Sequence, residues 1–590
     1  MASGLSFAPT RRRVNTLLTQ RSQRAVSLML LGTLLVGGCA ARLVHLQLIQ
    51  GQTLRQRAEQ NRIALIPIPA DRGNIFDRKG RLLASNRLAR SVYLHPREET
   101  KAEWAKLVPR LAAILNIPAT EILTKLEQAG YRAAMPVRIS RNLSPQAFIA
   151  LVEEASHFPG MEIRGESNRF YPNGNLAAHI LGYINEATAA DLKAHPDYPM
   201  GMLVGQMGVE RLANATLKGQ WGSQIVEVNA AGQEINHLGI KPATAGDRLQ
   251  LTLDLDLQKT AETYLANRRG AVVVLDVKTG GILALASGPT FDPNLFTRRI
   301  TKAEWEQLQT GENPFLNRAL QGYPPGSTFK VVTAIAGMQS GKFSPDSTLM
   351  TYAAINLGGH LFHEHGSGYG VLGFRDALMV SSNTFFYQVG LQTGPEHVAK
   401  WGKQLGIGEI TRLGLDGENH GMIPTPAEKE KMFGEPWYGG DTVSMAIGQG
   451  LVQVTPLELA VVYAAIANGG YRVKPHLFAR EDQDATYRPQ KIGLQPGTLR
   501  VVQQGLRAVV QSGTARQLST GTIPPTAGKT GTAEVLGQRD NAVFAGYGPA
   551  DKPRIAVAVV VENGGFGAES AVPIAHEIYK TYFKRSQRPR

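Results

Sequence analysis

The apolar positions near the N-terminus form one long stretch. Residues 25–41 carry no charge, and beyond a single arginine, Arg42, the apolar sequence runs from Leu43 to Ile49. A helix over residues 25–49 is long enough to cross the hydrocarbon core of a bilayer, about 30 Å, if the Arg42 side chain reaches back to the interface. The stretch therefore predicts one transmembrane helix. A buried core helix and a cleaved signal peptide are the alternatives.

Residues 50–248 mix short strand-forming runs with polar, helix-forming segments. Residues 63–68 predict a β-strand, and helices are predicted at 101–115, 119–129 and 145–155. No nucleophile beside a base, metal-ligand spacing or phosphate-binding loop stands out in this part of the sequence. We expect Arg72 and Asp77 to form a structural ion pair here, and a catalytic role for the two is the alternative.

The pattern changes at Leu249, where longer buried strands begin. The predicted elements are a helix introduced by residues 249–254, strands at 271–276, 281–287, 541–548 and 554–561, and a helix at 574–583. We expect the early and late strands to share one sheet, with a long insertion between them. The tight turn between the first two strands contains Lys278-Thr279-Gly280.

Composition and charge narrow the class of protein. The 590 residues are 43% hydrophobic and 19% charged, which is typical of a folded protein of two or three domains. Of the net charge of +15, ten charges come from residues 1–24 and from the last eleven residues. The five arginines of residues 1–24 predict a cytoplasmic leader, with the rest of the chain outside. The basic tail is interpreted as a solvated end, and no feature supports nucleic-acid binding.

The single cysteine, Cys39, lies inside the apolar stretch, so the chain has no intramolecular disulfide. Residues 35–39 resemble a lipoprotein cleavage site, which leaves lipidation at Cys39 as an alternative. We expect an uncleaved anchor, because the leader is long and the apolar helix continues beyond Cys39.

The candidate chemistry centres on residues 324–330, Pro-Pro-Gly-Ser-Thr-Phe-Lys. Proline and glycine end the preceding structure, and residues 331–338 predict an apolar helix. At the start of a helix, Ser327 and Lys330 would share a face. A serine hydroxyl needs a neighbouring base, which a desolvated amine can supply, and the free N–H groups of a helix start favour an oxyanion. No other lysine in the chain has a serine three residues before it.

Two further motifs follow in order: Ser381-Ser382-Asn383 and Lys529-Thr530-Gly531-Thr532. Ordered Ser-x-x-Lys, Ser-x-Asn and Lys-Thr-Gly motifs resemble those of the penicillin-recognising serine acyl-transferases, which are the penicillin-binding proteins and serine β-lactamases. Residues 72–80, Arg-Gly-Asn-Ile-Phe-Asp-Arg-Lys-Gly, resemble the signature of the monofunctional class B penicillin-binding proteins. Partial motifs at Ser140-Arg141-Asn142 and Lys278-Thr279-Gly280 are out of order, so we assign them no chemistry.

The resemblance implies an α+β fold with a single transmembrane helix, an elongated mixed pedestal domain and a C-terminal transpeptidase domain. The transpeptidase domain would have a β-lactamase-like antiparallel sheet flanked by helices. The predicted boundaries are 1–24 for the leader, 25–49 for the transmembrane helix, 50–248 for the pedestal, 249–584 for the transpeptidase domain and 585–590 for the tail. Class B members use the pedestal without chemistry, and the glycosyltransferase motif of class A members is absent.

The motif residues are then expected to divide the catalytic work. Ser327 is the predicted nucleophile, and Lys330 is the predicted base in acylation. Ser381 would relay a proton to the departing amine. Asn383 would hydrogen-bond both the substrate backbone and Lys330.

Substrate binding is predicted for the third motif. Lys529 and Thr530 would contact the substrate carboxylate, and Gly531 would permit close approach of the backbone. The resemblance implies that the N–H groups of Ser327 and Thr532 form the oxyanion hole.

The implied reaction is peptidoglycan cross-linking by a serine-type D,D-transpeptidase. The nucleophile would attack a D-Ala-D-Ala stem peptide, expel D-alanine and pass the acyl group to an amine of a neighbouring stem. β-Lactams would stall at the first step, because the Glu-x-x-Leu-Asn of class A β-lactamases is absent between the second and third motifs. No cofactor is expected. His360, His363 and His365 are interpreted as solvated loop residues, with a metal site as the alternative.

Residues 136–144 and 158–160 resemble the cell-elongation branch of class B. The septal branch and a non-catalytic β-lactam or cell-wall sensor are the alternatives. The expected partners are stem peptides, β-lactams, the inner membrane, a glycan polymerase of the shape, elongation, division and sporulation (SEDS) family, and elongation-complex proteins.

Overall fold

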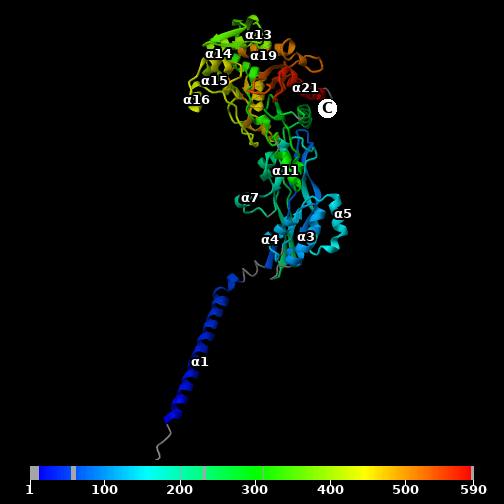
Figure 1. Ribbon diagram of the computed structural model, residues 1–590, viewed down its shortest axis with the longest axis vertical. Helices are drawn as coiled ribbons and strands as arrows, with labels where there is room; N and C mark the ends of the chain where they lie inside the picture. The colour runs from blue at the N-terminus through cyan, green and yellow to red at the C-terminus, as the bar shows by residue number, and fades with distance from the viewer. Residues whose placement is uncertain are drawn as a thin grey trace, which may run out of the picture. The chain divides into compact units, whose positions relative to one another are not determined.

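The structure is a computed structural model that describes residues 12–54, 62–133, 135–199, 201–229, 234–266, 268–309 and 311–586. The chain divides into two compact units. The first comprises residues 1–68 and 221–242, and the second comprises residues 69–220 and 243–590. Figure 1 labels the main helices and colours the chain from blue at the N-terminus to red at the C-terminus. The start of the predicted leader and the end of the basic tail lie outside the described residues.

The first unit contains the predicted apolar helix. Helix α1 (Arg12–Val44) continues into a short π-helical turn (His45–Ile49). Among the described residues, Arg24–Ile49 is the one helical segment long and apolar enough to cross a membrane, and its side chains are not buried in a protein core. It therefore fits a single-pass membrane anchor better than a buried core helix.

A three-stranded antiparallel sheet completes this unit, in the order β1-β8-β9. Its strands are β1 (Ile63–Ile68), β8 (Gly222–Val228) and β9 (Glu234–Lys241). The strand predicted at residues 63–68 is confirmed.

In the second unit, the long strand β3 (Leu82–Leu94) organises the pedestal part of the chain. It pairs antiparallel with β5 (Met161–Phe170), from Ser85 opposite Phe170 to Leu94 opposite Met161. The other strands of this sheet are β2 (Ile75–Phe76), β4 (Val137–Ser140) and β10 (Leu249–Gln250). Shorter elements nearby are α6 (Ala178–Leu181), β6 (Ile184–Glu186), α7 (Ala189–Ala194), β7 (Leu203–Gly205), α8 (Gly208–Leu212) and α9 (Asn214–Leu217).

Three helices of this region confirm the predicted pattern. They are α3 (Lys101–Leu115), α4 (Ala119–Ala129) and α5 (Pro145–Glu153), and they share a core that includes Trp104, Leu126 and Leu151. Helix α3 begins with a capping box in which Thr100 and Glu103 satisfy each other's backbone N–H groups. Helix α5 ends slightly earlier than predicted, where a 3-10 turn follows.

The predicted ion pair between Arg72 and Asp77 is wrong. Arg72 Nε instead donates to Glu210 at 2.6 Å, and Arg81 donates to Asp77 at 2.6 Å. Five residues of largely extended chain, which contain β2, span about 16 Å, so the two side chains lie at opposite ends of a strand. The second residue that neutralises Glu210 is Arg169, whose Nε lies 2.7 Å from the carboxylate.

The transpeptidase part is built on a five-stranded antiparallel sheet of order β12-β11-β21-β20-β19. Its strands are β11 (Gly270–Asp276), β12 (Ile282–Gly288), β19 (Ala527–Ala533), β20 (Asn541–Gly548) and β21 (Ile555–Val561). Strand β11 pairs with β21, which confirms that early and late segments share one sheet.

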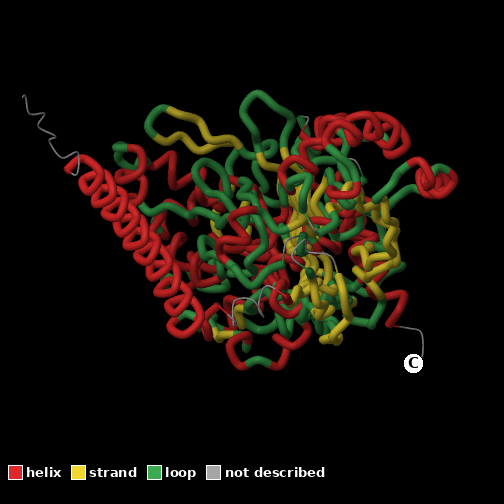
Figure 2. Tube along the Cα trace, turned by 90° about the horizontal axis from the view of Figure 1, so that it is seen from below, coloured by secondary structure: helices red, strands yellow, loops and turns green. Residues whose placement is uncertain are grey.

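Both faces of this sheet are buried. Val273 belongs to the core formed with α18 (Pro456–Ala467), whereas Val272 and Val274 belong to the core formed with α10 (Leu255–Leu265) and α21 (Val572–Ser586). Side chains alternate between the faces of a strand, so a strand covered on both faces needs a continuous apolar run. Figure 2 colours the strands yellow and the helices red.

The segment between β12 and β19 carries most of the helices of the transpeptidase part. They are α11 (Lys302–Gln309), α12 (Lys330–Gln339), α13 (Phe374–Val380), α14 (Asn383–Thr393), α15 (Pro395–Leu405), α16 (Pro426–Phe433), α17 (Gly439–Ala446), α18 and α19 (Pro496–Gln511). Its strands are β13 (Thr348–Thr351), β14 (Ala354–Leu357), β15 (His360–His363), β16 (Gly370–Gly373), β17 (Tyr471–Arg472) and β18 (Gln490–Lys491), and α20 (Gly567–Ser570) follows β21.

The buried Arg72–Glu210–Arg169 cluster generates a stability prediction. Burial raises the pKa of Glu210, but the charges of Arg169 and Arg72 lower it more, so Glu210 is ionised. We expect Glu210→Gln to lower the free energy of unfolding by about 3–5 kcal/mol, because it leaves two guanidinium groups without their counter-charge. Urea denaturation followed by circular dichroism measures this.

The matched control is Glu127→Gln in the exposed ion pair with Lys101, whose side chains are 65% and 67% exposed. Solvent screens this pair, so the control should unfold almost as the parent protein does. Equal effects of the two substitutions would contradict a stabilising role for the buried cluster.

Candidate active site

The candidate nucleophile lies in a tight turn rather than in the first turn of an α-helix. Residues Gly326–Phe329 form a 3-10 helix, and α12 begins at Lys330. Gly326 has a φ of +53°, and a Cβ added there would lie 2.6 Å from the backbone oxygen of Thr532. Glycine is therefore required at the position before Ser327, since the third motif approaches the backbone at this point.

Lys330 is completely buried, and its amine faces the second motif. Its Nζ donates to the backbone oxygen of Ser381 and to Asn383 Oδ1, each at 2.6 Å, and lies 3.4 Å from Ser381 Oγ. Burial lowers the pKa of Lys330 well below its usual range, and the charge of Lys529 lowers it further, while Glu364 has the opposite effect. This environment favours the neutral amine, which is the form that can accept a proton.

The second motif forms the junction between α13 and α14. Ser381 ends α13 in the left-handed conformation, with a φ of +63°, and the Ser382 hydroxyl caps α14. A non-glycine residue in this conformation costs free energy and persists only where its surroundings hold it. Here the turn directs both the carbonyl of Ser381 and the amide of Asn383 at Lys330.

The third motif lies on β19, at the edge of the sheet. Lys529 is completely buried, and burial lowers its pKa to about 7. Strand alternation places Lys529 and Gly531 on one side of the strand and Thr530 and Thr532 on the other. A Cβ added at Gly531 would lie 2.8 Å from the backbone oxygen of Pro325, so β19 runs directly beside the turn that holds Ser327.

The structure thus brings together all eight predicted site residues from three distant segments. These are Ser327, Lys330, Ser381, Asn383, Lys529, Thr530, Gly531 and Thr532. Contacts join η6, the 3-10 turn of Ser327, to β19, and α12 to α14. Their individual catalytic roles stay predictions.

Two polar residues at this site were not identified from the sequence. Glu364 is buried and accepts hydrogen bonds from Ser382 Oγ and from the backbone of Asn383. Thr514 Oγ1 lies 2.6 Å from Thr530 Oγ1. Neither residue belongs to a motif, and each reaches its partner through tertiary folding, so no local sequence signal identifies them.

Two buried hydrogen bonds from other segments hold the backbone of the turn that contains Ser327. The backbone N–H of Gly326 donates to the oxygen of Gly448 at 2.9 Å, and the Tyr463 hydroxyl donates to the oxygen of Thr328 at 2.9 Å. Both contacts fix backbone atoms of the turn. The Gly448-Gln449-Gly450 segment therefore has a structural function next to the site.

The histidine-rich stretch has an ordinary surface environment. His360, His363 and His365 are exposed, the first two on the β14–β15 hairpin and the third just after it. Among the described residues, no group of three histidine, cysteine, aspartate or glutamate side chains is placed to hold a metal ion. The partial motif at Lys278 lies in the turn between β11 and β12, with its lysine exposed.

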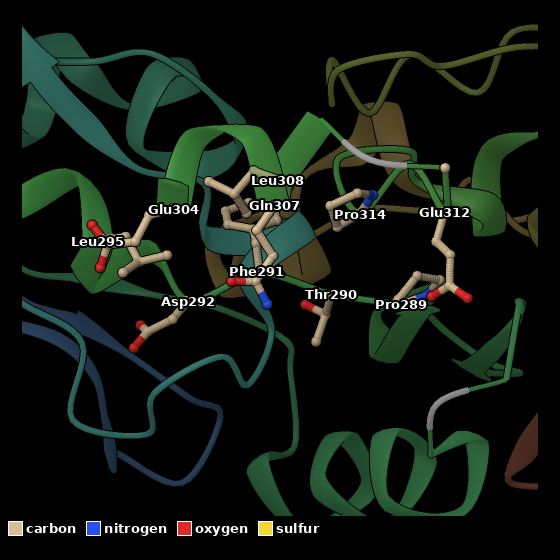
Figure 3. A pocket seen from close by; sticks show the side chains of 11 residues that line it. Pro289, Thr290, Phe291, Asp292, Leu295, Glu304, Gln307, Leu308, Glu312 and Pro314 are labelled. Carbon is tan, nitrogen blue, oxygen red and sulfur yellow. The ribbon is translucent and has the colours of Figure 1, made fainter. Parts of the chain in front are cut away.

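A separate cavity of about 530 Å³ lies away from the three motifs. Figure 3 shows Phe291 and Leu308 near its middle and Glu312 at one end. None of the eight site residues lines it.

The antiparallel sheet with helices on both faces, and the three motifs gathered at its β19 edge, define a penicillin-binding transpeptidase. Two family models match the chain: the penicillin binding protein transpeptidase domain over residues 270–580 and the penicillin-binding protein dimerisation domain over residues 67–251.

Individual relatives narrow this class. The peptidoglycan D,D-transpeptidase MrdA of Acinetobacter baumannii is 34% identical over 90% of this chain and 83% of its own length. The MrdA protein of Escherichia coli K12 is 32% identical over 90% of both chains.

Solved structures of similar proteins support the same assignment. A complex of penicillin-binding protein 2 with MreC from Helicobacter pylori matches with a TM-score of 0.78 and 28% identity, over 89% of this chain and 99% of the other. A peptidoglycan synthase complex that couples polymerization and crosslinking matches with a TM-score of 0.72 and 33% identity, over 95% and 98%. The chain belongs to the class B penicillin-binding proteins, in the penicillin-binding protein 2 (MrdA) branch, and is a peptidoglycan D,D-transpeptidase of the elongation type. The septal and sensor alternatives are not favoured.

The two buried lysines predict how the reaction depends on pH. Lys330 must be neutral to act as a base, whereas Lys529 must be charged to attract a carboxylate. Because the pKa of Lys529 is lowered to about 7, its charge is present below this pH and is lost above it. We expect the second-order rate constant for acylation by benzylpenicillin to fall as the pH rises above about 7.

Stopped-flow or quench measurements of acylation across the pH range test this expectation. Lys529→Gln should be slow at every pH and should lose the alkaline decline, whereas Lys278→Gln should retain it. A rate constant that keeps rising from pH 7 into the alkaline range would show that Lys529 is not the group concerned.

Proposed function

We propose that this transpeptidase works through a covalent acyl-enzyme on Ser327. The observation that carries the proposal is the buried Lys330 amine, one helical turn from Ser327, with hydrogen bonds to both predicted catalytic groups of the second motif. A neutral amine in this position can take the serine proton during attack.

In the first step, the Ser327 hydroxyl attacks the carbonyl carbon of the penultimate D-alanine of a stem peptide. Lys330 accepts the hydroxyl proton as the new C–O bond forms. Ser381 Oγ, 3.4 Å from Lys330 Nζ, relays a proton to the departing nitrogen, so that D-alanine leaves as a neutral amine. In the second step, an amine of a neighbouring stem attacks the ester carbonyl and forms the new amide bond. The ester C–O bond breaks, the proton of the amine passes to Ser327 Oγ, and the serine hydroxyl is regenerated.

The third motif positions the substrate during both steps. Lys529 supplies positive charge, and Thr530 and Thr532 supply hydroxyl groups, for the carboxylate of the terminal D-alanine. The backbone N–H groups of Ser327 and Thr532 stabilise the oxyanion, and loss of one such donor typically costs about 2.7–4 kcal/mol of transition-state stabilisation. The close approach of β19 to the nucleophile turn supports this pairing.

β-Lactams bind the same site because their strained amide mimics the D-Ala-D-Ala bond. We expect a penicilloyl ester on Ser327 that persists after excess drug is removed. Ser327→Ala should abolish labelling with little change in thermal unfolding, because a half-buried hydroxyl is not needed for packing. Lys330→Ala should slow acylation by about 10²–10⁴-fold.

Intact-mass spectrometry followed by peptide mapping measures the label. The matched controls are two lysines of Lys-Thr-Gly sequences: Lys278→Ala should label normally, and Lys529→Ala should not. A label on another serine, or release of penicillin within seconds, would contradict the assignment.

We also propose a division of labour along the chain. Residues 1–24 form a cytoplasmic leader, 25–49 an inner-membrane anchor, 50–248 the pedestal, 249–584 the transpeptidase domain and 585–590 a basic tail. The pedestal would position the enzyme and contact a SEDS glycan polymerase and elongation-complex proteins. The complexes solved for relatives, one with MreC and one a peptidoglycan synthase complex, support this proposal.

The topology can be tested with spheroplasts. Because the leader carries five arginines and Arg24–Ile49 is long enough to span the bilayer, external protease should digest everything beyond about residue 50. Immunoblotting with antibodies to the C-terminal domain reads the result. Protection of the domain that contains Ser327 would contradict the proposed orientation.

A further inference from the structure

A buried carboxylate holds the second motif in place. Glu364 follows strand β15, and only 7% of its surface is exposed. The backbone N–H of Glu364 itself donates to the oxygen of Ala353, at the other end of the β14–β15 hairpin. The base of the hairpin is therefore closed, and the Glu364 side chain is anchored in it.

All the hydrogen bonds that Glu364 accepts come from neutral donors, and most come from the start of α14. Its Oε1 accepts from the N–H of Asn383 at 2.7 Å and of His365 at 2.9 Å. Its Oε2 accepts from Ser382 Oγ at 2.5 Å and from the N–H and hydroxyl of Thr384 at 3.0 and 2.9 Å. The carboxylate thus satisfies N–H groups that a helix start leaves free.

The same hairpin also fixes the side chain of Asn383. Asn383 Nδ2 donates to the backbone oxygen of His363 at 3.4 Å, while Asn383 Oδ1 accepts from Lys330 Nζ at 2.6 Å. The neighbouring residues His363 and Glu364 therefore hold both the amide group and the backbone of Asn383. Because the amide nitrogen is engaged by the hairpin, the amide oxygen is presented to Lys330.

Glu364 is also the negative charge that acts on the buried Lys330. Burial raises the pKa of Glu364, but the hydrogen bonds from Ser382 and from the backbone lower it below its ordinary value, so the group is ionised. The charges that act on Lys330 are Lys529 on β19 and Glu364, and His365 beside the hairpin is in turn affected by Lys330. Among the described residues, Glu364 makes no ion pair with a lysine, arginine or histidine, so its charge acts at a distance.

We propose that Glu364 is a positioning residue of the acyl-transfer reaction, which fixes the Asn383 amide against Lys330 and supplies negative charge to a site that holds two buried lysines. The inference rests on the proposed roles of Ser327 and Lys330. It assigns a function to a residue outside the three motifs.

A general role in helix capping would have a different consequence, and the chain offers a matched example. Glu458 is also buried and caps α18, where it accepts hydrogen bonds from the N–H groups of Thr455, Gly408 and Gly421. It does not act on Lys330. If Glu364 only stabilised a helix, Glu364→Gln and Glu458→Gln would have the same effects.

The experiment compares full-length Glu364→Gln, Glu364→Asp and Glu458→Gln, each purified in detergent. The second-order rate constant of acylation by fluorescent penicillin is measured from about pH 5 to about pH 9, a range that extends about two units on either side of the pKa of about 7 to which burial lowers Lys529. Thermal unfolding of each variant is measured as well. Glu364→Gln should slow acylation by about 10²-fold at neutral pH, the effect of a misplaced catalytic group.

The dependence of the acylation rate on pH distinguishes the two roles. A purely structural role of Glu364 would leave the midpoint of this dependence unchanged. Without the carboxylate, the pKa of Lys330 falls further, so the rise in rate as Lys330 loses its proton should move to lower pH by on the order of one unit. Glu364→Asp keeps the charge and should leave this midpoint unchanged while slowing the reaction. Glu458→Gln should lower thermal stability without moving the midpoint.

A parental rate in Glu364→Gln, or a slower rate with an unmoved midpoint as in Glu458→Gln, would overturn the proposal. If Glu364→Gln does not fold, the Glu364→Asp variant tests the proposal. Its side chain is shorter by one methylene, so a rate equal to that of the parent protein would overturn the positioning role. The Ser327→Ala variant distinguishes a failure of the proposed mechanism from a failure of the proposed role of Glu364. If Ser327→Ala is still labelled, the proposed mechanism fails; if only the Glu364 variants behave as the parent does, the mechanism stands and the positioning role is lost.

Discussion

Burial of the Lys330 amine is the constraint on which the surrounding structure depends. A buried amine must exchange its hydration for hydrogen bonds, and Lys330 does so with the Ser381 carbonyl and the Asn383 amide. Both groups belong to one turn, which must take a left-handed conformation at Ser381 to present them together. Holding that turn requires further buried polar groups, and the β14–β15 hairpin provides them. Lys330, the turn and the hairpin therefore form a single interdependent assembly.

A second constraint is the close contact between the backbone of β19 and the backbone of the turn that contains Ser327. Strand β19 and the nucleophile turn approach so closely that side chains at Gly326 or Gly531 would collide with Thr532 or Pro325. This approach places the backbone of β19 directly beside the backbone of the turn that contains Ser327. The glycine of the third motif is thus explained by the packing of β19 against this turn.

The sequence allowed the prediction of structure that depends on local signals. Helices α3 and α4 and strand β20 have the predicted limits, because capping residues, turns and continuous apolar runs define them locally. The gathering of the three motifs followed from family resemblance. The pairing of Arg72 with Glu210, and the contacts of Glu364 and Thr514, could not be predicted, because each joins positions that only the tertiary fold brings together.

The two regions of the second unit use buried charge in opposite ways. In the pedestal, Glu210 lies between Arg72 and Arg169, so opposite charges are in contact and the cluster is compensated. At the active site, Lys330 and Lys529 are both buried, and within the described residues neither forms an ion pair with a carboxylate. The charge of Lys529 lowers the pKa of Lys330, and Glu364 offsets this only from a distance. The pedestal thus compensates buried charge by direct contact, whereas burial at the candidate active site favours the neutral forms of both lysines.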